Sequence, residues 1–267
     1  MNRTHSCRLR VGTSGYSYAE WSGAGFYPPE TSARDMLPLY ARQFSITELN
    51  YTWYQMPKAA AMARMLSKVP TGFDFAAKLT RSMTHEVDPH GWRADVDRFR
   101  EGMAPLTQAG RLAAVLVQLP SAFDRSRGHR LYLAHLLDAL EGLPAALEFR
   151  HRSWAEERVF QELERRRVTL VTVDAPKLPD LFPPLAVVTN PDLLYIRFHG
   201  RNARGWRSGN MQKQFDYDYS AAELAEWSGR IIPAMAARCG DGIVFFNNHV
   251  RGQAPRNAKL LAEQLGG

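Results

Sequence analysis

The chain repeats one arrangement: a short apolar run is followed at once by polar side chains of the kind that enzymes use. Segment 145–154 shows it most clearly, because Leu147 and Phe149 lie in one phase of a two-residue period. Glu148 and Arg150 lie in the other phase, so a β-strand here places both charges on one face. The carboxyl end of such a strand is suited to form part of a polar site. Similar runs lead to Glu48 and Asn50, Lys78, Gln118, Asp174, Arg197 and His199, and Asn247, Asn248 and His249.

Segments with helical spacing separate these runs. The expected strands cover residues 9–12, 46–50, 73–78, 112–119, 169–174, 194–199 and 243–247, with one more strand beginning at Ala145. The expected helices cover residues 33–43, 59–66, 92–106, 130–140, 156–167, 221–237 and 255–265. This alternation predicts an α/β fold, a (β/α)8 TIM barrel that forms one domain over residues 1–267. Segment 175–193 holds five prolines, so the sixth helix is expected to be short or absent.

The composition limits the partners and the compartment. The net charge of +7 favours an anionic partner, either a small molecule or nucleic acid. Only Cys7 and Cys239 are present, so we expect a reducing, cytoplasmic location. The segment MNRTHSCRLR lacks the apolar core of a signal peptide, and no apolar stretch is long enough to span a membrane. The sequence gives no indication of protein partners.

The chain contains, in order, the blocks GTSGYSYAEW, FYPPE, ELNYTWYQMP, FDFAAKLTRSMTH, QLPSAF, EFRHRSW, YIRFHG and FFNNHVRGQAPRNA. These blocks extend over about residues 9–265, and they resemble the YecE-like family, also known as the domain of unknown function 72, DUF72. The resemblance implies a TIM barrel and a cytoplasmic protein, mostly bacterial or archaeal. It implies no established activity.

Active sites of TIM barrels form at the carboxyl ends of the strands, so the polar residues there are the candidates. We predict acid or base catalysis by Glu48, Glu148, Asp174 and His199. We predict binding of substrate or anion by Lys78, Arg150, Arg197, Asn50, Asn247, Asn248, Arg201, Arg204 and Trp206. The alternative for each charged group is an ordinary internal ion pair. The residues expected in one pocket are Glu48, Lys78, Glu148, Arg150, Asp174, Arg197 and Asn248.

A metal site is the less favoured interpretation of these residues. Histidines and carboxylates are suitable metal ligands. However, Lys78, Arg150 and Arg197 would repel a dication by about a few kcal/mol for each close pair. The sequence also lacks HxxxH and HExxH spacings. We therefore predict neither a metal nor a cofactor.

The basic loop, residues 197–213, indicates a binding site for phosphate. It carries several arginines and no acidic residue, and it follows the seventh expected strand. Loops after the seventh and eighth strands of such barrels frequently bind phosphate. Trp206 is placed to stack on a ring or a base. The alternative is a loop that is merely solvated.

Three functions remain open at this point. The leading hypothesis is a metal-independent enzyme, a hydrolase, lyase or isomerase, that acts on a phosphate-bearing or nucleic-acid-derived substrate. The second is a noncatalytic nucleic-acid-binding protein that uses the basic loop. The third is a metal-dependent phosphodiesterase, which needs at least three of Glu48, Glu148, Asp174, His199 and His249 around one point.

Overall fold

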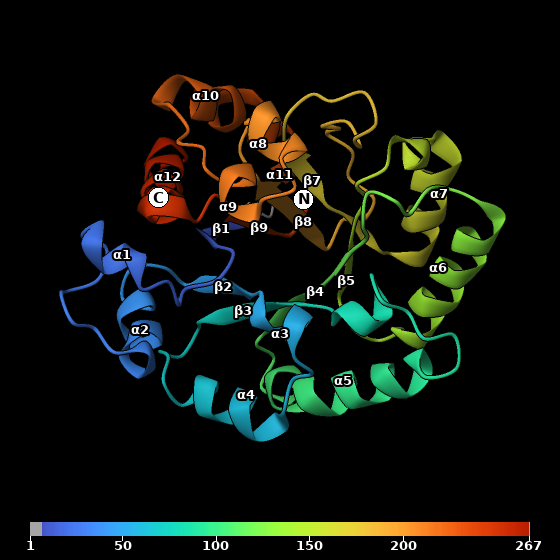
Figure 1. Cartoon of the computed structure of the whole chain (residues 1–267), viewed down its shortest axis with the longest axis horizontal. Coiled ribbons are helices and arrows are strands. Elements are labelled where there is room, and N and C mark those ends of the chain that lie inside the picture. The colour runs from blue at the N-terminus through green and yellow to red at the C-terminus, as the bar shows by residue number, and fades with distance from the viewer. Residues whose placement is uncertain (1–6, 267) are drawn as a thin grey trace, which may run out of the picture.

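The computed structural model describes residues 7–266, so most of the amino-terminal segment weighed above as a signal peptide lies outside it. The strands in these residues pair in parallel, as Figure 1 shows. They are β1 (Arg8–Thr13), β2 (Ile46–Leu49), β3 (Asp74–Lys78), β4 (Leu112–Gln118), β5 (Ala145–Glu148), β6 (Thr169–Leu170), β7 (Thr172–Asp174), β8 (Leu193–Phe198) and β9 (Asp241–Phe246). The predicted α/β class is confirmed.

The strands form two sheets, in the orders β1-β9-β8-β7 and β2-β3-β4-β5-β6. The sixth expected strand contributes to both, because Val171 interrupts it between β6 and β7. On the other side, β1 approaches β2 so closely that a Cβ atom on Gly12 would collide with the carbonyl oxygen of Ile46. Ser14 and Glu48 form a single parallel bridge there. The resulting arrangement is TIM-barrel-like.

Helices surround the strands, as Figure 1 shows. The longer ones follow the strands that the sequence pattern predicts. The helices are α1 (Glu20–Gly23), α2 (Ala33–Tyr40), α3 (Tyr51–Tyr54), α4 (Ala59–Leu66), α5 (Trp92–Gln108), α6 (Arg127–Ala139), α7 (Glu157–Arg166), α8 (Ala203–Arg207), α9 (Met211–Gln214), α10 (Ala221–Glu226), α11 (Ile232–Ala236) and α12 (Gln253–Gln264).

Two segments depart from a regular strand–helix alternation. Residues 175–192 contain no helix, which agrees with the prediction for this proline-rich segment. The expected helix 221–237 forms as α10 and α11 with a π-helical turn, Trp227–Ile231, between them. Wider turns of this kind re-aim the side chains that they carry. Here the turn carries Trp227, whose indole donates a hydrogen bond to Asp174.

Side chains in one phase of the strands lie in layers between the two sheets. At the amino ends of the strands, Arg10 pairs with Asp74 and Asp241. The next layers are apolar, and their buried members are Ile46, Ala76, Ala114, Leu116, Ala146, Val171, Val173, Leu193, Tyr195, Ile243 and Phe245. The polar side chains at the carboxyl ends follow in the same phase. Within residues 7–266, no helix is both long and apolar enough to cross a membrane.

Candidate active site

A cavity of about 1170 Å³ lies at the carboxyl ends of the strands. Strand residues form its floor, and aromatic side chains from loops and from the short helices α3 and α8 form its walls. The predicted site residues that line it are Glu48, Asn50, Lys78, Arg150, Arg197, Asn247 and Trp206. The aromatic residues that line it are Tyr16, Tyr18, Tyr51, Trp53, Tyr54, Trp206 and Phe215. Of the seven residues expected in one pocket, Glu48, Lys78, Arg150 and Arg197 line the cavity.

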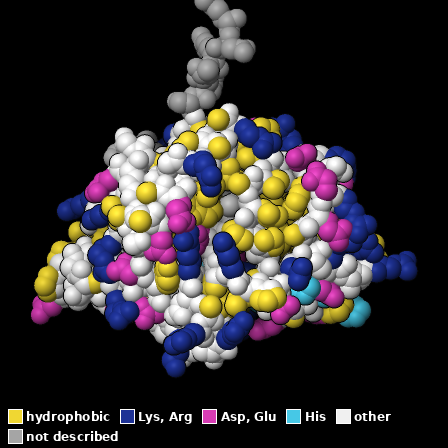
Figure 2. All heavy atoms as spheres, turned by 90° about the horizontal axis from the view of Figure 1, so that it is seen from above, with side chains coloured by type: hydrophobic (Ala, Val, Ile, Leu, Met, Phe, Trp, Pro, Cys, Tyr) yellow, Lys and Arg dark blue, Asp and Glu magenta, His cyan; other side chains and the backbone are white. Residues whose placement is uncertain are grey.

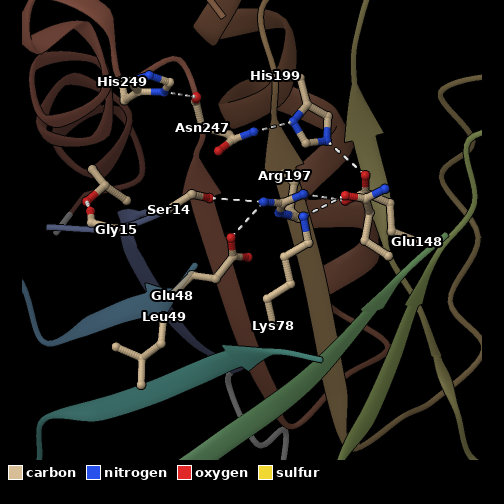
Figure 3. Close-up of polar contacts among 12 residues, drawn as sticks. Ser14, Gly15, Glu48, Leu49, Lys78, Glu148, Arg197, His199, Asn247 and His249 are labelled. Atoms are coloured by element: carbon tan, nitrogen blue, oxygen red, sulfur yellow. Dashed lines mark hydrogen bonds and ion pairs between the residues drawn. The ribbon is translucent and has the colours of Figure 1, made fainter. Parts of the chain in front are cut away.

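Arg197 is the centre of the floor, as Figure 3 shows. Its Nη2 atom lies 2.6 Å from Glu48 Oε1, and its Nη1 atom lies 2.7 Å from Glu148 Oε2. The other oxygen of Glu48 accepts a hydrogen bond from the hydroxyl of Tyr195, and Ser14 Oγ lies 3.3 Å from Arg197 Nη2. All these side chains are almost fully buried. The guanidinium therefore bridges two carboxylates that come from different strands.

Arg150 and His199 lie on the other side of Glu148. Arg150 Nε forms an ion pair with Glu148 Oε1 at 2.6 Å, and Arg150 Nη2 lies 3.2 Å from His199 Nε2. The guanidinium also lies over the ring of Trp206, 5.0 Å from its centre. Burial alone would raise the pKa of Glu148, but the charges of Arg150 and Arg197 outweigh it and hold that pKa well below its usual range. Glu148 is thus an anion at neutral pH.

Lys78 is the cation of the site whose charge is least compensated by its neighbours. Its Nζ atom donates to Gln118 Oε1 at 2.7 Å and lies 4.8 Å from the centre of the Trp53 ring. Among the described residues, no carboxylate lies within ion-pair distance of it. Burial, and after it the charge of Arg197, lowers the pKa of Lys78 from 10.5 to about 7. At neutral pH, a large share of this side chain is a free amine.

Asp174 is placed differently from the prediction, on the opposite face of its strand. Its carboxylate accepts hydrogen bonds from Tyr219 Oη and Trp227 Nε1, both at 2.8 Å, and from Arg201. These partners belong to the helical layer outside the strands, while Val173 faces inward. Asp174 therefore does not line the cavity that Glu48 lines.

Glu148 and His199 contact Arg150 at the floor but do not themselves line the cavity. Three further predicted residues lie away from it. Asn248 Nδ2 donates to Tyr217 O and to Asn257 Oδ1, both at 2.7 Å, because Asn248 points opposite to Asn247. Arg201 is held by Asp174 outside the strands. Arg204 lines a separate depression of about 520 Å³. The arginines of the basic loop therefore diverge, and Arg207 alone among the three that follow Arg197 lines the main cavity.

Several residues of the site were not among the predicted ones. Tyr195 is a strand residue whose hydroxyl completes the coordination of Glu48. Gln118 ends β4 and binds Lys78, and His85 lines the cavity beside Trp53. The signal for Gln118 was present, since it ends an apolar run. No pattern in the sequence distinguishes Tyr195 from an ordinary apolar core residue.

The geometry disfavours a metal site formed by the predicted acids. Arg197 binds both Glu48 and Glu148, while Asp174 lies on the other face of its strand. Across residues 7–266, no group of three or more His, Cys, Asp and Glu side chains is arranged to hold a metal ion. The three-ligand cluster required by the phosphodiesterase hypothesis is therefore not formed by the described residues.

His199 gives a prediction for the pH dependence of stability. Burial, followed by the charge of Arg150, lowers the pKa of His199 from 6.5 to about 3. As the pH falls below 6.5, the unfolded chain takes up a proton that the folded chain does not, so the folded state loses stability. When the pH is lowered from about 6.5 to about 5, the free energy of unfolding of His199→Asn is expected to fall by about 2 kcal/mol less than that of the unaltered protein.

Denaturant unfolding at a series of pH values measures this difference. His135→Asn, at an exposed position on α6, is the matched control and should follow the unaltered protein. If His199→Asn and His135→Asn showed the same pH slope, His199 would have to accept a proton in the folded state, which contradicts the prediction.

Fold and cavity together define a TIM-barrel-like α/β protein with a charged, aromatic-walled site at the carboxyl ends of its strands. Residues 10–267 match the family described as "Protein of unknown function DUF72", so the chain belongs to the DUF72 family. The resemblance seen in the sequence is confirmed.

Relatives extend over nearly the whole chain. The UPF0759 protein YunF of Bacillus subtilis (strain 168) is 28% identical over 253 residues, which cover 90% of this chain and 89% of that protein. The crystal structure of a DUF72 family protein from Thermotoga maritima MSB8 is 36% identical, covers 97% and 100% of the two chains, and superposes with a TM-score of 0.88. A DUF72 family protein from Enterococcus faecalis V583 is 28% identical, covers 97% and 96%, and gives a TM-score of 0.87.

Proposed function

We propose that this protein is an enzyme that acts on a phosphate-bearing or nucleic-acid-derived substrate in the cavity at the strand ends. The observation that carries the proposal is the combination of cations and aromatic rings that line it. Lys78, Arg150 and Arg207 face the cavity, and the acidic groups of the floor are already bound to Arg197. An anionic substrate with a ring system fits such a lining.

Arg150 is the main anion-binding group in this proposal. Its Nε and Nη2 atoms face Glu148 and His199, and among the described residues Nη1 has no hydrogen-bond partner. Trp206 packs against the guanidinium and holds its plane. A fixed guanidinium with a free N–H edge binds a phosphate oxygen without a large entropy cost.

The carboxylates have a positioning role in this proposal, and Lys78 has the chemical one. Glu48 and Glu148 hold Arg197 and Arg150 in place, and both are screened from acting as bases by their ion pairs. Lys78, partly a free amine at neutral pH, is suited to accept and return a proton. Such a base serves hydrolases, lyases and isomerases, and the site needs no metal ion for these steps.

Arg150→Met tests the anion site. Loss of one charge-assisted hydrogen bond costs about 1.5–3 kcal/mol, so the Kd for inorganic phosphate is expected to rise about tenfold or more. Isothermal titration calorimetry at fixed ionic strength measures it. Arg204→Met, on the rim of the separate depression, is the matched control and should leave the Kd unchanged. An equal loss in both variants would show that only net charge matters.

Nucleic-acid binding without catalysis is the second candidate, and one observation favours it. The cavity exceeds the size typical for a small-molecule site, and Tyr54 and Met211 at its mouth are 56% and 57% exposed. A single strand with stacked bases fits such a mouth. On the face drawn in Figure 2, however, basic side chains lie scattered among acidic and apolar ones. Salt-sensitive oligonucleotide binding that survives Lys78→Met and Arg150→Met would favour this candidate.

A further inference from the structure

Lys78 has a combination of contacts that a structural lysine does not need. Its ammonium group would lie near Arg197 and Arg150, while Glu48 on β2 and Glu148 on β5 are bound by those same guanidiniums. Its hydrogen-bond partner is the neutral amide of Gln118. Figure 3 shows the side chain reaching toward the Arg197–Glu148 pair. A charged lysine is therefore desolvated here without a counter-ion of its own.

These contacts favour the neutral amine, which is a nucleophile. Lysines become nucleophilic when they are desolvated beside another cation. The groups that face Lys78 are Glu48 on β2, Glu148 and Arg150 on and after β5, Arg197 on β8, and His85 after β3. His85 is itself neutral, because burial lowers its pKa to about 4. His85 therefore adds no negative charge that would hold the proton on Lys78, and the partial effect of Glu148 and Glu48 leaves the pKa of Lys78 at about 7.

We propose that Lys78 forms an imine with the carbonyl carbon of an aldehyde or ketone whose phosphate group is bound by Arg150. Both side chains line the same cavity. The inference rests on the proposed function, since it places a phosphate-bearing substrate in the same site. It adds the reactive group of that substrate and the atom that attacks it.

The chemistry is balanced without a further reagent. The Nζ lone pair adds to the carbonyl carbon, the carbon–oxygen π electrons move to oxygen, and a proton passes from nitrogen to that oxygen. The resulting carbinolamine expels its hydroxyl group, which takes the proton that remains on nitrogen and leaves as water. The product is a carbon–nitrogen double bond, and its protonated form withdraws electrons from the neighbouring carbon. Cleavage or isomerisation beside a carbonyl group follows from that polarisation.

Pyridoxal 5′-phosphate, an aldehyde with a phosphate group, is the probe for this site. The protein is mixed with it, the imine is reduced with borohydride, and labelled peptides are quantified by mass spectrometry. Lys78 is expected to be labelled about tenfold or more faster than Lys58 and Lys68, because Lys78 is desolvated in the cavity beside two guanidiniums whereas the other two lysines are exposed. The surface lysines are internal controls within one molecule. Lys78→Arg should abolish this fast label.

Two further labelling experiments test the imine and the proposed function independently of each other. Pyridoxal, which lacks the phosphate, should label Lys78 more slowly, and Arg150→Met should remove that difference. Labelling of Lys78 no faster than that of Lys58 overturns the imine, and phosphate binding measured by calorimetry then decides the proposed function separately. Equal labelling by both probes in the unaltered protein overturns the role of Arg150 and leaves Lys78 as the nucleophile.

Discussion

Replacement of Arg197 by methionine is expected to lower the free energy of unfolding by about 3–5 kcal/mol. The side chain is 1% exposed, and it lies between Glu48 and Glu148, which are both fully buried. Burial lowers the pKa of Arg197, but the two carboxylates outweigh it and raise that pKa above its usual value. Without the guanidinium, Glu48 is left as a buried charge whose remaining partner is the Tyr195 hydroxyl.

Urea unfolding at neutral pH measures the change. Arg165→Met is the matched control, because Arg165 also binds a carboxylate, Glu162, but at an exposed position. Exposed pairs contribute about 0.2–1 kcal/mol. The double variant Arg197→Met with Glu148→Gln should lose less than the sum of the two single losses, because both changes break one contact. Additive losses, or an Arg197 effect as small as that of Arg165, would contradict the buried network.

Replacement of Asp174 by alanine is the second large effect, and it is expected to alter stability without altering the site. The change leaves the Tyr219 hydroxyl and the Trp227 indole N–H without their acceptor in a buried place. An unsatisfied buried donor costs about 1–3 kcal/mol, so a loss of about 2–4 kcal/mol is expected. Phosphate affinity should stay within about twofold, because Asp174 faces away from the cavity.

Asp192→Ala is the control for this variant, since Asp192 pairs with Arg167 at the surface. It should change stability by less than about 1 kcal/mol. A large loss of phosphate affinity in Asp174→Ala, with Asp192→Ala unaffected, would restore Asp174 to the catalytic group and contradict its position outside the strands.

The sequence predicted the strand faces well wherever one phase of a strand was clearly apolar. In residues 145–150 the phase of Leu147 and Phe149 is entirely apolar, so Glu148 and Arg150 were assigned to one face, and the two side chains form an ion pair there. The same reasoning placed Arg197 and His199 together. A period of two is enough when the two phases differ in polarity.

The same reasoning did not predict which way side chains point in strands whose two phases have similar polarity. In TLVTVD, one phase holds Thr169, Val171 and Val173, and the other ends in Asp174. Both phases mix polar and apolar residues, so nothing in the pattern shows that Asp174 points outward. Asn247 and Asn248 are adjacent and chemically identical, and only the register of β9 separates them. The partners of Glu48 also depend on strands far apart in the sequence.

The network around Arg197 has a consequence for folding. Arg197 extends from β8 in one sheet, while Glu48 and Glu148 extend from β2 and β5 in the other. The guanidinium therefore meets its partners only when the two sheets have docked, and we expect this non-local contact to form late, because the entropy of closing long loops opposes it. Contacts that are absent from the transition state govern escape from the native state. The buried charges at the floor of the cavity are therefore expected to slow unfolding more than they speed folding. The lifetime of the folded protein then depends on the same residues that shape its site.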